Sequence, residues 1–511
     1  MTMQNVVMEQ PGAVNAEGKM SRSSPENSSG ALDCTLMRGI AWTGAIKWLS
    51  QLLSWVSTIV VARLLNPEDY GIVAMAGVFV GFIGLLNEFG LGAAVVALRH
   101  LTEEQIASMH SLASLFGVAG FLLTCLVAIP AGRIYAASNI PLVIVVMGAG
   151  FAFLAVRSVP SALLERALRF KLLALLEGGQ AIVAALVTVG LAWWGVGYWA
   201  LVVGGVAGHA AVTAVIMSQH PVRYARPSFR SLHEALRFSS HVLVGRISWY
   251  VASNADVFIA GRIFGQGIVG AYSFACTLAN LPLDKITALL SRVMPAFYSS
   301  VQTDPTILRR YLLLLTEGLA LLTFPVGVGM ALVADAFVPL VLGEQWVGVV
   351  LPLQVLSCWA VVRSLFGLIS PILFVTGGSR LSMLSGLFCM VVYPLGFWFG
   401  SGWGAVGIAL AWVAVQPVSW IAPYRHALAA VRLPFLEYLS VLWPAATSTV
   451  VMAGGVYFIH QVLPGNSSHL LQLLCEATAG VTMYAAMIGI FHRARLSRFL
   501  GMIKGSHTVM I

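Results

Sequence analysis

Charged side chains are scarce in this chain. Asp, Glu, Lys and Arg make up 10% of its 511 residues, against about 25% in a soluble globular domain. Hydrophobic residues make up 59% of the chain, and the mean hydropathy is +0.87. A chain this apolar cannot hide all of its hydrophobic side chains in a water-soluble core. The composition therefore excludes a soluble globular protein and predicts a membrane protein with many spans.

Signatures of catalysis and of metal binding are absent from the sequence. It contains no Walker A loop, no His-Glu-x-x-His motif and no Gly-x-Ser-x-Gly motif. The six cysteines are far apart and none has Cys-x-x-Cys spacing, so we interpret them as small core residues. The cations behind the net charge of +9 are scattered over separate loops, which does not indicate a nucleic-acid partner. We predict neither an enzyme nor a cofactor.

Apolar segments alternate with short polar breaks along the whole chain. Each segment has roughly the 20 residues that an α-helix needs to cross a bilayer. The predicted fold class is therefore an all-α polytopic membrane protein of about 14 transmembrane helices, with 12 or 13 left open because two of the breaks are very short. The predicted spans are 39–62, 71–97, 106–130, 140–158, 173–194, 198–218, 238–262, 268–294, 312–333, 349–374, 381–400, 404–424, 441–462 and 470–491.

The distribution of cations predicts the orientation. With the N-terminus in the cytoplasm, the inside segments hold twenty Lys and Arg residues, whereas the outside segments hold only Arg63, Arg133 and Arg262. Cytoplasmic loops of membrane proteins carry such an excess of positive charge. Both termini are therefore predicted to be cytoplasmic.

An internal repeat divides the chain into two halves. Arg63 closes one span and Gly71 opens the next, and Arg262 and Gly270 repeat this spacing 199 residues later. A second repeated motif is the Gly-rich turn that begins at Gly195, which resembles the turn that begins at Gly404. Two parallel six-helix repeats with a substrate path between them follow from this pattern.

The predicted units are a disordered cytoplasmic tail (1–37), an N-terminal six-helix bundle (38–218), a C-terminal six-helix bundle (234–424), an appended helix pair (438–491) and a basic cytoplasmic tail (492–511).

Polar side chains inside the spans mark the candidate site, because ionisable groups in a membrane usually face a cavity or a partner. Lys and Arg side chains on the first spans of each half predict a chamber for an anionic cargo, since Lys and Arg bind phosphate well. Pairs such as Asp284 with Lys285, or Arg246 with Asp256, have an alternative interpretation as mutual neutralisation that fixes helix packing. The candidate cargo-binding residues are Lys47, Gln51, Arg246, Asn254, Lys285 and Arg292, and the candidate proton carriers are Glu88, Asp256 and Asp284.

Several motifs resemble the bacterial polysaccharide-transporter (Wzx-type) flippases. They are Val61-Ala-Arg-Leu-Leu-Asn-Pro-Glu-Asp-Tyr-Gly71, Glu88-Phe-Gly-Leu-Gly, Ser253-Asn-Ala-Asp-Val-Phe-Ile-Ala-Gly-Arg262 and Leu281-Pro-Leu-Asp-Lys-Ile. The likeness runs from about residue 38 to 430. Within this family, the chain is most similar to the branch that serves exopolysaccharides. It implies the fold of the multidrug/oligosaccharidyl-lipid/polysaccharide exporter superfamily, with two six-helix bundles around a cavity that opens alternately to each side.

The resemblance also implies a cargo, a membrane and partners. The cargo would be an undecaprenyl-pyrophosphate-linked oligosaccharide repeat unit, flipped across the bacterial cytoplasmic (inner) membrane among its membrane lipids. A polysaccharide polymerase and a chain-length regulator are the implied protein partners. Three alternatives stay open: a peptidoglycan-precursor lipid flippase, a cation-coupled drug antiporter of the same superfamily, and a glycan polymerase or ligase. The identity of the glycan, the energy source and the oligomeric state do not follow from the sequence.

Overall fold

Helices make up all the regular secondary structure of the described part of the chain. The computed structural model describes residues 51–87, 92, 95–96, 101–226, 232–302, 304–464 and 468–493, with the backbone alone for 232–244, for 379 and for most of 289–296. After a first helix at Gln51–Leu64, the longer helices are α2 (Pro67–Asn87), α4 (Glu103–Tyr135), α5 (Ile140–Gly148), α6 (Gly150–Arg166), α7 (Phe170–Trp193), α8 (Trp199–Gln219), α9 (Leu232–Phe264), α10 (Gln266–Ser300), α11 (Pro305–Phe337), α12 (Val350–Phe366), α13 (Ile369–Val375), α14 (Ser379–Gly400), α15 (Gly404–Ala430), α16 (Phe435–Val462) and α17 (His469–Phe491). Three short helical pieces are η1 (Val338–Leu342), η2 (Glu344–Val349) and η3 (Ser401–Trp403).

Local signals in the sequence account for where several helices begin. Thr102 and Gln105 form a reciprocal capping box at the start of α4, with distances of 2.8 and 3.2 Å. The carboxylate of Asp304 accepts hydrogen bonds from the first backbone N–H groups of α11, ahead of a proline at the first helical position. Ser468 caps α17 in the same way. These caps satisfy backbone donors that would otherwise lack a partner.

Helix length and composition confirm a multi-pass membrane protein. Ten helical segments among the described residues are long and apolar enough to cross a membrane. One of them, Arg380–Ala430, consists of two helices, α14 and α15, joined by η3. Helices α9 and α10 have 33 and 35 residues, but their polar side chains keep them out of this apolar set. The number of fourteen spans therefore remains a prediction.

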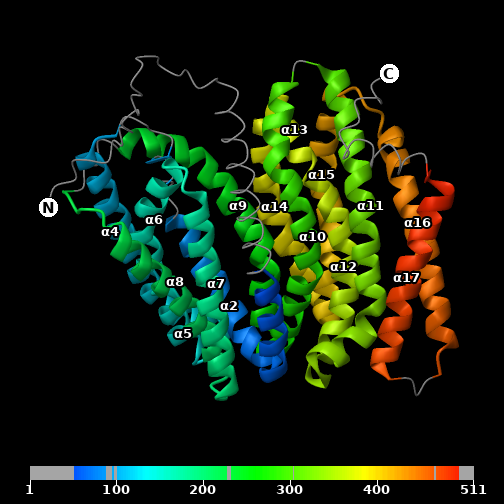
Figure 1. Ribbon diagram of the computed structural model, residues 1–511, viewed down its shortest axis with the longest axis horizontal. Helices are drawn as coiled ribbons and strands as arrows, with labels where there is room; N and C mark the ends of the chain where they lie inside the picture. The colour runs from blue at the N-terminus through cyan, green and yellow to red at the C-terminus, as the bar shows by residue number, and fades with distance from the viewer. Residues whose placement is uncertain are drawn as a thin grey trace, which may run out of the picture.

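The helices form two groups, with α9 running between them (Figure 1). Helices α4 to α8 pack together on one side, and α10 to α15 pack together on the other. Contacts of α2 with α10 and of α9 with α14 join the two groups. Helices α16 and α17 lie at the outer edge, where both pack against α11. The main core cluster is continuous from α2 and α5 to α12 and α15.

Glycine permits the close crossing of α2 and α10. A Cβ atom on Gly71 would lie 1.8 Å from the carbonyl oxygen of Gln266, and one on Gly270 would lie 1.7 Å from that of Pro67. No side chain larger than hydrogen fits at either position unless the helices move apart. The two glycines that mark the internal repeat in the sequence therefore meet at one helix crossing.

The predicted span at 140–158 was too short. Helices α5 and α6 continue this segment to Arg166, where the chain turns at residues 167–169. Val159, Ala162 and Leu164 are buried, so apolar packing continues the helix past the polar residues Arg157 and Ser158. Arg157 consequently lies well inside a helix and not at its end.

Candidate functional site

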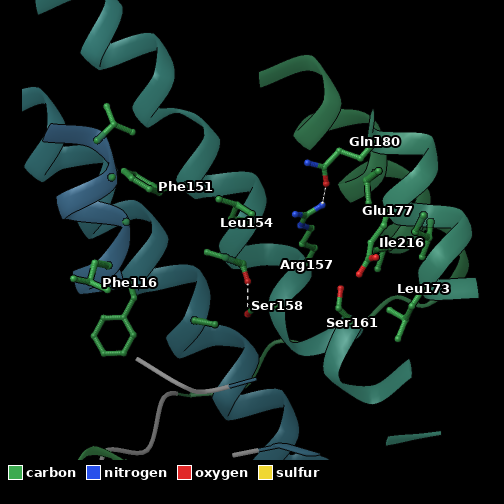
Figure 2. A pocket seen from close by; sticks show the side chains of 18 of the residues that line it. Phe116, Phe151, Leu154, Arg157, Ser158, Ser161, Leu173, Glu177, Gln180 and Ile216 are labelled. Atoms are coloured by element: carbon green, nitrogen blue, oxygen red, sulfur yellow. Dashed lines mark hydrogen bonds between the residues drawn. The ribbon is translucent and has the colours of Figure 1, made fainter. Parts of the chain in front are cut away.

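A cavity of about 730 Å³ lies among α2, α4, α6, α7, α8 and α9. Its walls are mostly apolar, with Phe116, Phe151 and Leu154 among the side chains that line it (Figure 2). Gly81 and Gly84 of α2 contribute to the wall, about 15 Å along the helix from the crossing at Gly71, since an α-helix rises 1.5 Å per residue. The cavity and the helix crossing thus lie at different levels of α2.

The polar part of the cavity centres on Arg157 of α6. Its Nη1 donates a hydrogen bond of 2.6 Å to Oε1 of Gln180 on α7. The carboxylate of Glu177, one turn earlier on α7, lies near enough to interact electrostatically with the guanidinium (Figure 2). A guanidinium carries five N–H donors, and the bond to Gln180 needs only one of them. The bond to Gln180 therefore holds Arg157 at the wall of the cavity.

Helix α9 supplies another part of the wall through Arg246 and Tyr250. The two residues are four positions apart and therefore share a helix face, and both line the cavity. Tyr250 donates a hydrogen bond of 2.9 Å to the carbonyl of Val78 on α2. Gly81 makes room for this phenol, because a Cβ atom there would lie 2.2 Å from the Tyr250 oxygen. Tyr250 thereby joins the face of α9 that carries Arg246 to α2.

A second arginine lies in the other group of helices. Nη2 of Arg363 on α12 donates hydrogen bonds to Asn280 and Asp284 on α10, at 2.7 and 3.0 Å. Asp284 is 62% exposed and Arg363 is 34% exposed, so this ion pair is accessible. Asp284 therefore pairs with a residue on a neighbouring helix, and the adjacent Lys285 is exposed.

Asp256 of α9 is the most deeply buried of the predicted site residues whose side chains the structure describes. At 3% exposure, its carboxylate accepts hydrogen bonds from the phenol of Tyr272 at 2.8 Å and the indole of Trp412 at 3.0 Å. The backbone N–H of Val257 donates a third bond, at 2.7 Å. These partners come from α10, α15 and α9 itself and are all electrically neutral. Arg246 is ten residues away, roughly 15 Å along the helix, which is too far for the mutual neutralisation considered from the sequence.

Of the remaining predicted site residues, the structure describes the side chains of only Gln51 and Asn254. Lys47 and Glu88 lie outside the described residues, and Arg292 belongs to α10 without a described side chain. Gln51 is half-buried at the start of the first described helix. Asn254 donates to the carbonyl of Tyr250 within its own helix, at 2.9 Å.

Arg157 and Arg363 were not singled out from the sequence. Each interrupts an apolar segment, which is the signal that would have found them. Arg157 was overlooked because the predicted span ended one residue after it. The structure gives each of these arginines a partner on a neighbouring helix.

The end of the first helix (Gln51–Leu64) and the beginning of α2 contact η1 and η2 of the other group of helices. The indole of Trp346 donates a 2.7 Å hydrogen bond to the carbonyl of Ala62 and is fully buried. Arg63 donates through Nε to the carbonyl of Val341 at 2.7 Å, and through Nη2 to that of Leu340. The ring of Tyr70 packs edge-on against Trp346, with centroids 5.2 Å apart. These contacts lie within nine residues of Gly71 and, with the α2–α10 crossing, join the two groups of helices.

Residues 60–351 match the protein family described as Polysaccharide biosynthesis protein. The lipopolysaccharide biosynthesis protein WzxC of Escherichia coli (strain K12) is 23% identical over 440 residues, which cover 81% of this chain and 88% of the relative. The succinoglycan biosynthesis transport protein ExoT of Rhizobium meliloti (strain 1021) is 23% identical over 483 residues, which cover 92% and 96%. These relatives are named for biosynthesis and transport of polysaccharides.

Solved structures establish the fold. A lipid II flippase, MurJ, in an inward closed conformation superimposes with a TM-score of 0.70 at 14% identity, covering 89% of this chain and 99% of that one. An inward-facing multidrug transporter of the MATE family gives a TM-score of 0.51 at 15% identity, covering 75% and 96%. The resemblance read from the motifs is therefore confirmed: the chain is a multi-pass membrane protein that belongs to the polysaccharide biosynthesis protein family.

Proposed function

We propose that the chain flips undecaprenyl-pyrophosphate-linked oligosaccharide repeat units across the bacterial cytoplasmic membrane by alternating access, for exopolysaccharide, capsule or O-antigen assembly. The observation that carries this proposal is the cavity of about 730 Å³, which combines the guanidinium groups of Arg157 and Arg246 with a mostly apolar wall. A guanidinium fork matches the oxygens of a diphosphate, and an apolar wall suits a cargo that enters from the lipid. The names of the relatives support a polysaccharide cargo.

Two arginines related by the internal repeat form the core of the proposed cargo site. Arg157 and Arg363 are 206 residues apart, close to the 199-residue spacing of Arg63 and Arg262. Each is held by residues of a neighbouring helix, and each has a carboxylate nearby, Glu177 for Arg157 and Asp284 for Arg363. In the proposed mechanism the diphosphate displaces these carboxylates as the two halves close on it. The sequence-predicted residues Lys47, Gln51, Arg246, Asn254, Lys285 and Arg292 would complete the site.

The proposed architecture places this site between two bundles within about 14 spans. Residues 38–218 and 234–424 form the bundles, 438–491 the appended pair, and 1–37 and 492–511 cytoplasmic tails. The grouping of α4–α8 and α10–α15 supports this division. The contacts around Gly71, Gly270 and Trp346 then act as the outer gate, closed while the cavity accepts cargo from inside. A polymerase and a chain-length regulator would receive the flipped units.

Energy coupling is proposed to use a buried carboxylate. Asp256 joins α9, α10 and α15 through three neutral donors, so gain of a proton would change how these helices are held together. Asp284 changes partner in the same mechanism when Arg363 binds cargo, and Glu88 is the corresponding candidate in the first half of the chain. If these acids only fix helix packing, coupling lies elsewhere: transport uses another ion gradient or the membrane potential, or it runs downhill because polymerisation outside consumes the cargo.

Deletion of the gene followed by lipid extraction tests the function. We expect undecaprenyl-linked repeat units to accumulate on the cytoplasmic leaflet, and a plasmid copy of the chain to clear them. The fold likeness to the lipid II flippase favours peptidoglycan precursor as the second candidate cargo. Accumulation of lipid II in place of the repeat units, with growth arrest, would identify that cargo and reject the polysaccharide one.

A further inference from the structure

A second cavity, of about 470 Å³, lies outside the proposed cargo site, between α11 and the helix pair α16–α17. Val326 and Met330 of α11, Met452 of α16 and Val481 of α17 are typical of its apolar lining. Ala477, Val481 and Ala485 on α17 are exposed along it, so it is a groove that opens at the protein surface. We call it the α11–α17 groove.

One carboxylate, Glu476, faces this apolar groove. It is the only charged side chain among the described residues that line the groove, and its exposure is 1%. Oε1 is 2.9 Å from Nδ1 of His460 and 3.1 Å from Nε2 of Gln472. Oε2 is buried and has no hydrogen-bond partner among the described residues. A buried carboxylate oxygen without a donor is costly in a membrane protein, so a donor from outside the chain is expected to fill this position.

The nearby donors in the described part of the chain bond to the other oxygen or to other groups. With Nδ1 of His460 as donor, the imidazole and Gln472 both bond to Oε1, and neither bond reaches Oε2. The phenol of Tyr484, the other polar side chain of the groove, donates to the carbonyl of Leu321 at 2.7 Å. Oε2 of Glu476 therefore lacks a hydrogen-bond donor among the described residues, and an ammonium group would supply a donor together with a positive charge.

We propose that the α11–α17 groove binds a membrane phospholipid whose headgroup carries a primary ammonium, such as an ethanolamine phospholipid. The ammonium donates to Oε2 of Glu476, and an acyl chain follows the apolar lining toward Tyr484, about 12 Å further along α17 at 1.5 Å per residue. An anionic headgroup is disfavoured by the carboxylate, and a choline headgroup has no N–H to donate. The bound lipid bridges α11 and α17 and helps to hold the outer helix pair on the protein.

Lipid retention by the purified full-length chain tests this site without any transport measurement. The protein in detergent is incubated with equal amounts of ethanolamine, choline and glycerol phospholipids with identical acyl chains, and the lipids that stay bound are counted by native mass spectrometry. We expect the ethanolamine lipid to be retained several-fold above the other two. Equal retention of all three, or preference for the glycerol lipid, would overturn the proposal.

Three variants locate the binding. Glu476→Gln is expected to reduce retention of the ethanolamine lipid to the choline level. Gly329→Leu is expected to reduce it as well, because a side chain at Gly329 meets nothing within 4 Å and so extends into the groove. Asp335→Asn is the matched control, since Asp335 is an exposed carboxylate of α11 that bonds to Gln354 and does not line the groove.

Each outcome for the variants has a defined meaning. Wild-type retention by Glu476→Gln overturns the proposal, and so does loss of retention in Asp335→Asn. If Glu476→Gln does not stay monodisperse in gel filtration, Gly329→Leu decides, and wild-type retention by that variant rejects the site. A flipping defect with normal lipid retention would concern the cargo site alone, so failure of the two proposals can be told apart.

Discussion

Gly71 and Gly270 face each other where α2 crosses α10, and a Cβ atom on Gly270 would lie 2.8 Å from the backbone nitrogen of Gly71. Both residues follow an arginine by eight positions, Arg63 and Arg262, in the two copies of the internal repeat. The contact therefore joins equivalent points of the two halves. Its closeness depends on glycine at both positions, because any Cβ would force the helix backbones apart.

Gly71→Ala is expected to destabilise the protein because the added methyl group would collide with the backbone of α10. Overpacking of a close contact costs about 1–3 kcal/mol. The measurement is the thermal unfolding midpoint of the purified protein. Gly77→Ala on the same helix is the control, since a Cβ there meets nothing within 4 Å. Equal midpoints for the two variants would show that α2 and α10 are not held together at Gly71.

Tyr484→Phe is expected to loosen α17 from α11. Pro325 has no N–H, so the carbonyl of Leu321 lacks its helical donor, and the phenol of Tyr484 donates to that carbonyl at 2.7 Å. Leaving a buried acceptor without a donor costs about 1–3 kcal/mol, which should lower the unfolding midpoint. The control Tyr457→Phe removes an exposed phenol that, among the described residues, bonds only to Gln461 of its own helix α16. A drop no larger than that of the control would contradict this account of α17.

The fold class could be predicted from the sequence, but the side chains that contact one another across helices could not. Long apolar runs identified the membrane helices, because length and hydropathy are local properties. The repeat around Gly71 and Gly270 was visible as spacing, although its meaning as a helix crossing needed the structure. Arg363 and Asp284 are 79 residues apart, and only helix packing brings them together. Glu476 was missed for the same reason, since its partner His460 lies on another helix.

Cysteine accessibility tests the orientation inferred from the cations. Single cysteines in place of the exposed residues Arg133 and Glu344 should react with a membrane-impermeant maleimide in intact spheroplasts. Those in place of Arg169 and Arg226 should react only after the membrane is opened. The six native cysteines are first replaced by serine or alanine. The reverse pattern at most of these sites would invert the topology.

The coupling proposal predicts that flipping responds to a proton gradient and that Asp256→Asn abolishes this response. Asparagine keeps the shape of the side chain and can still accept from Tyr272 and Trp412, but it cannot bind a proton. The measurement is the flipping rate in proteoliposomes with and without an imposed pH difference, with Glu88→Gln as a second variant. If the wild type ignores the gradient, or if both variants respond as it does, these carboxylates are structural.

Reconstituted flipping tests the central claim most directly. Proteoliposomes carry a fluorescent undecaprenyl-pyrophosphate oligosaccharide, and an external glycosidase cleaves only the fraction exposed on the outer leaflet, which is followed over time. We predict rapid exchange with wild-type protein and a loss of at least tenfold in rate for Arg157→Ala and for Arg363→Ala, since losing a hydrogen bond to a charged group costs about 1.5–3 kcal/mol. Arg133→Ala, at an exposed helix end, should flip as fast as wild type. Wild-type rates for both arginine variants, or no exchange with the wild-type protein, would contradict the account.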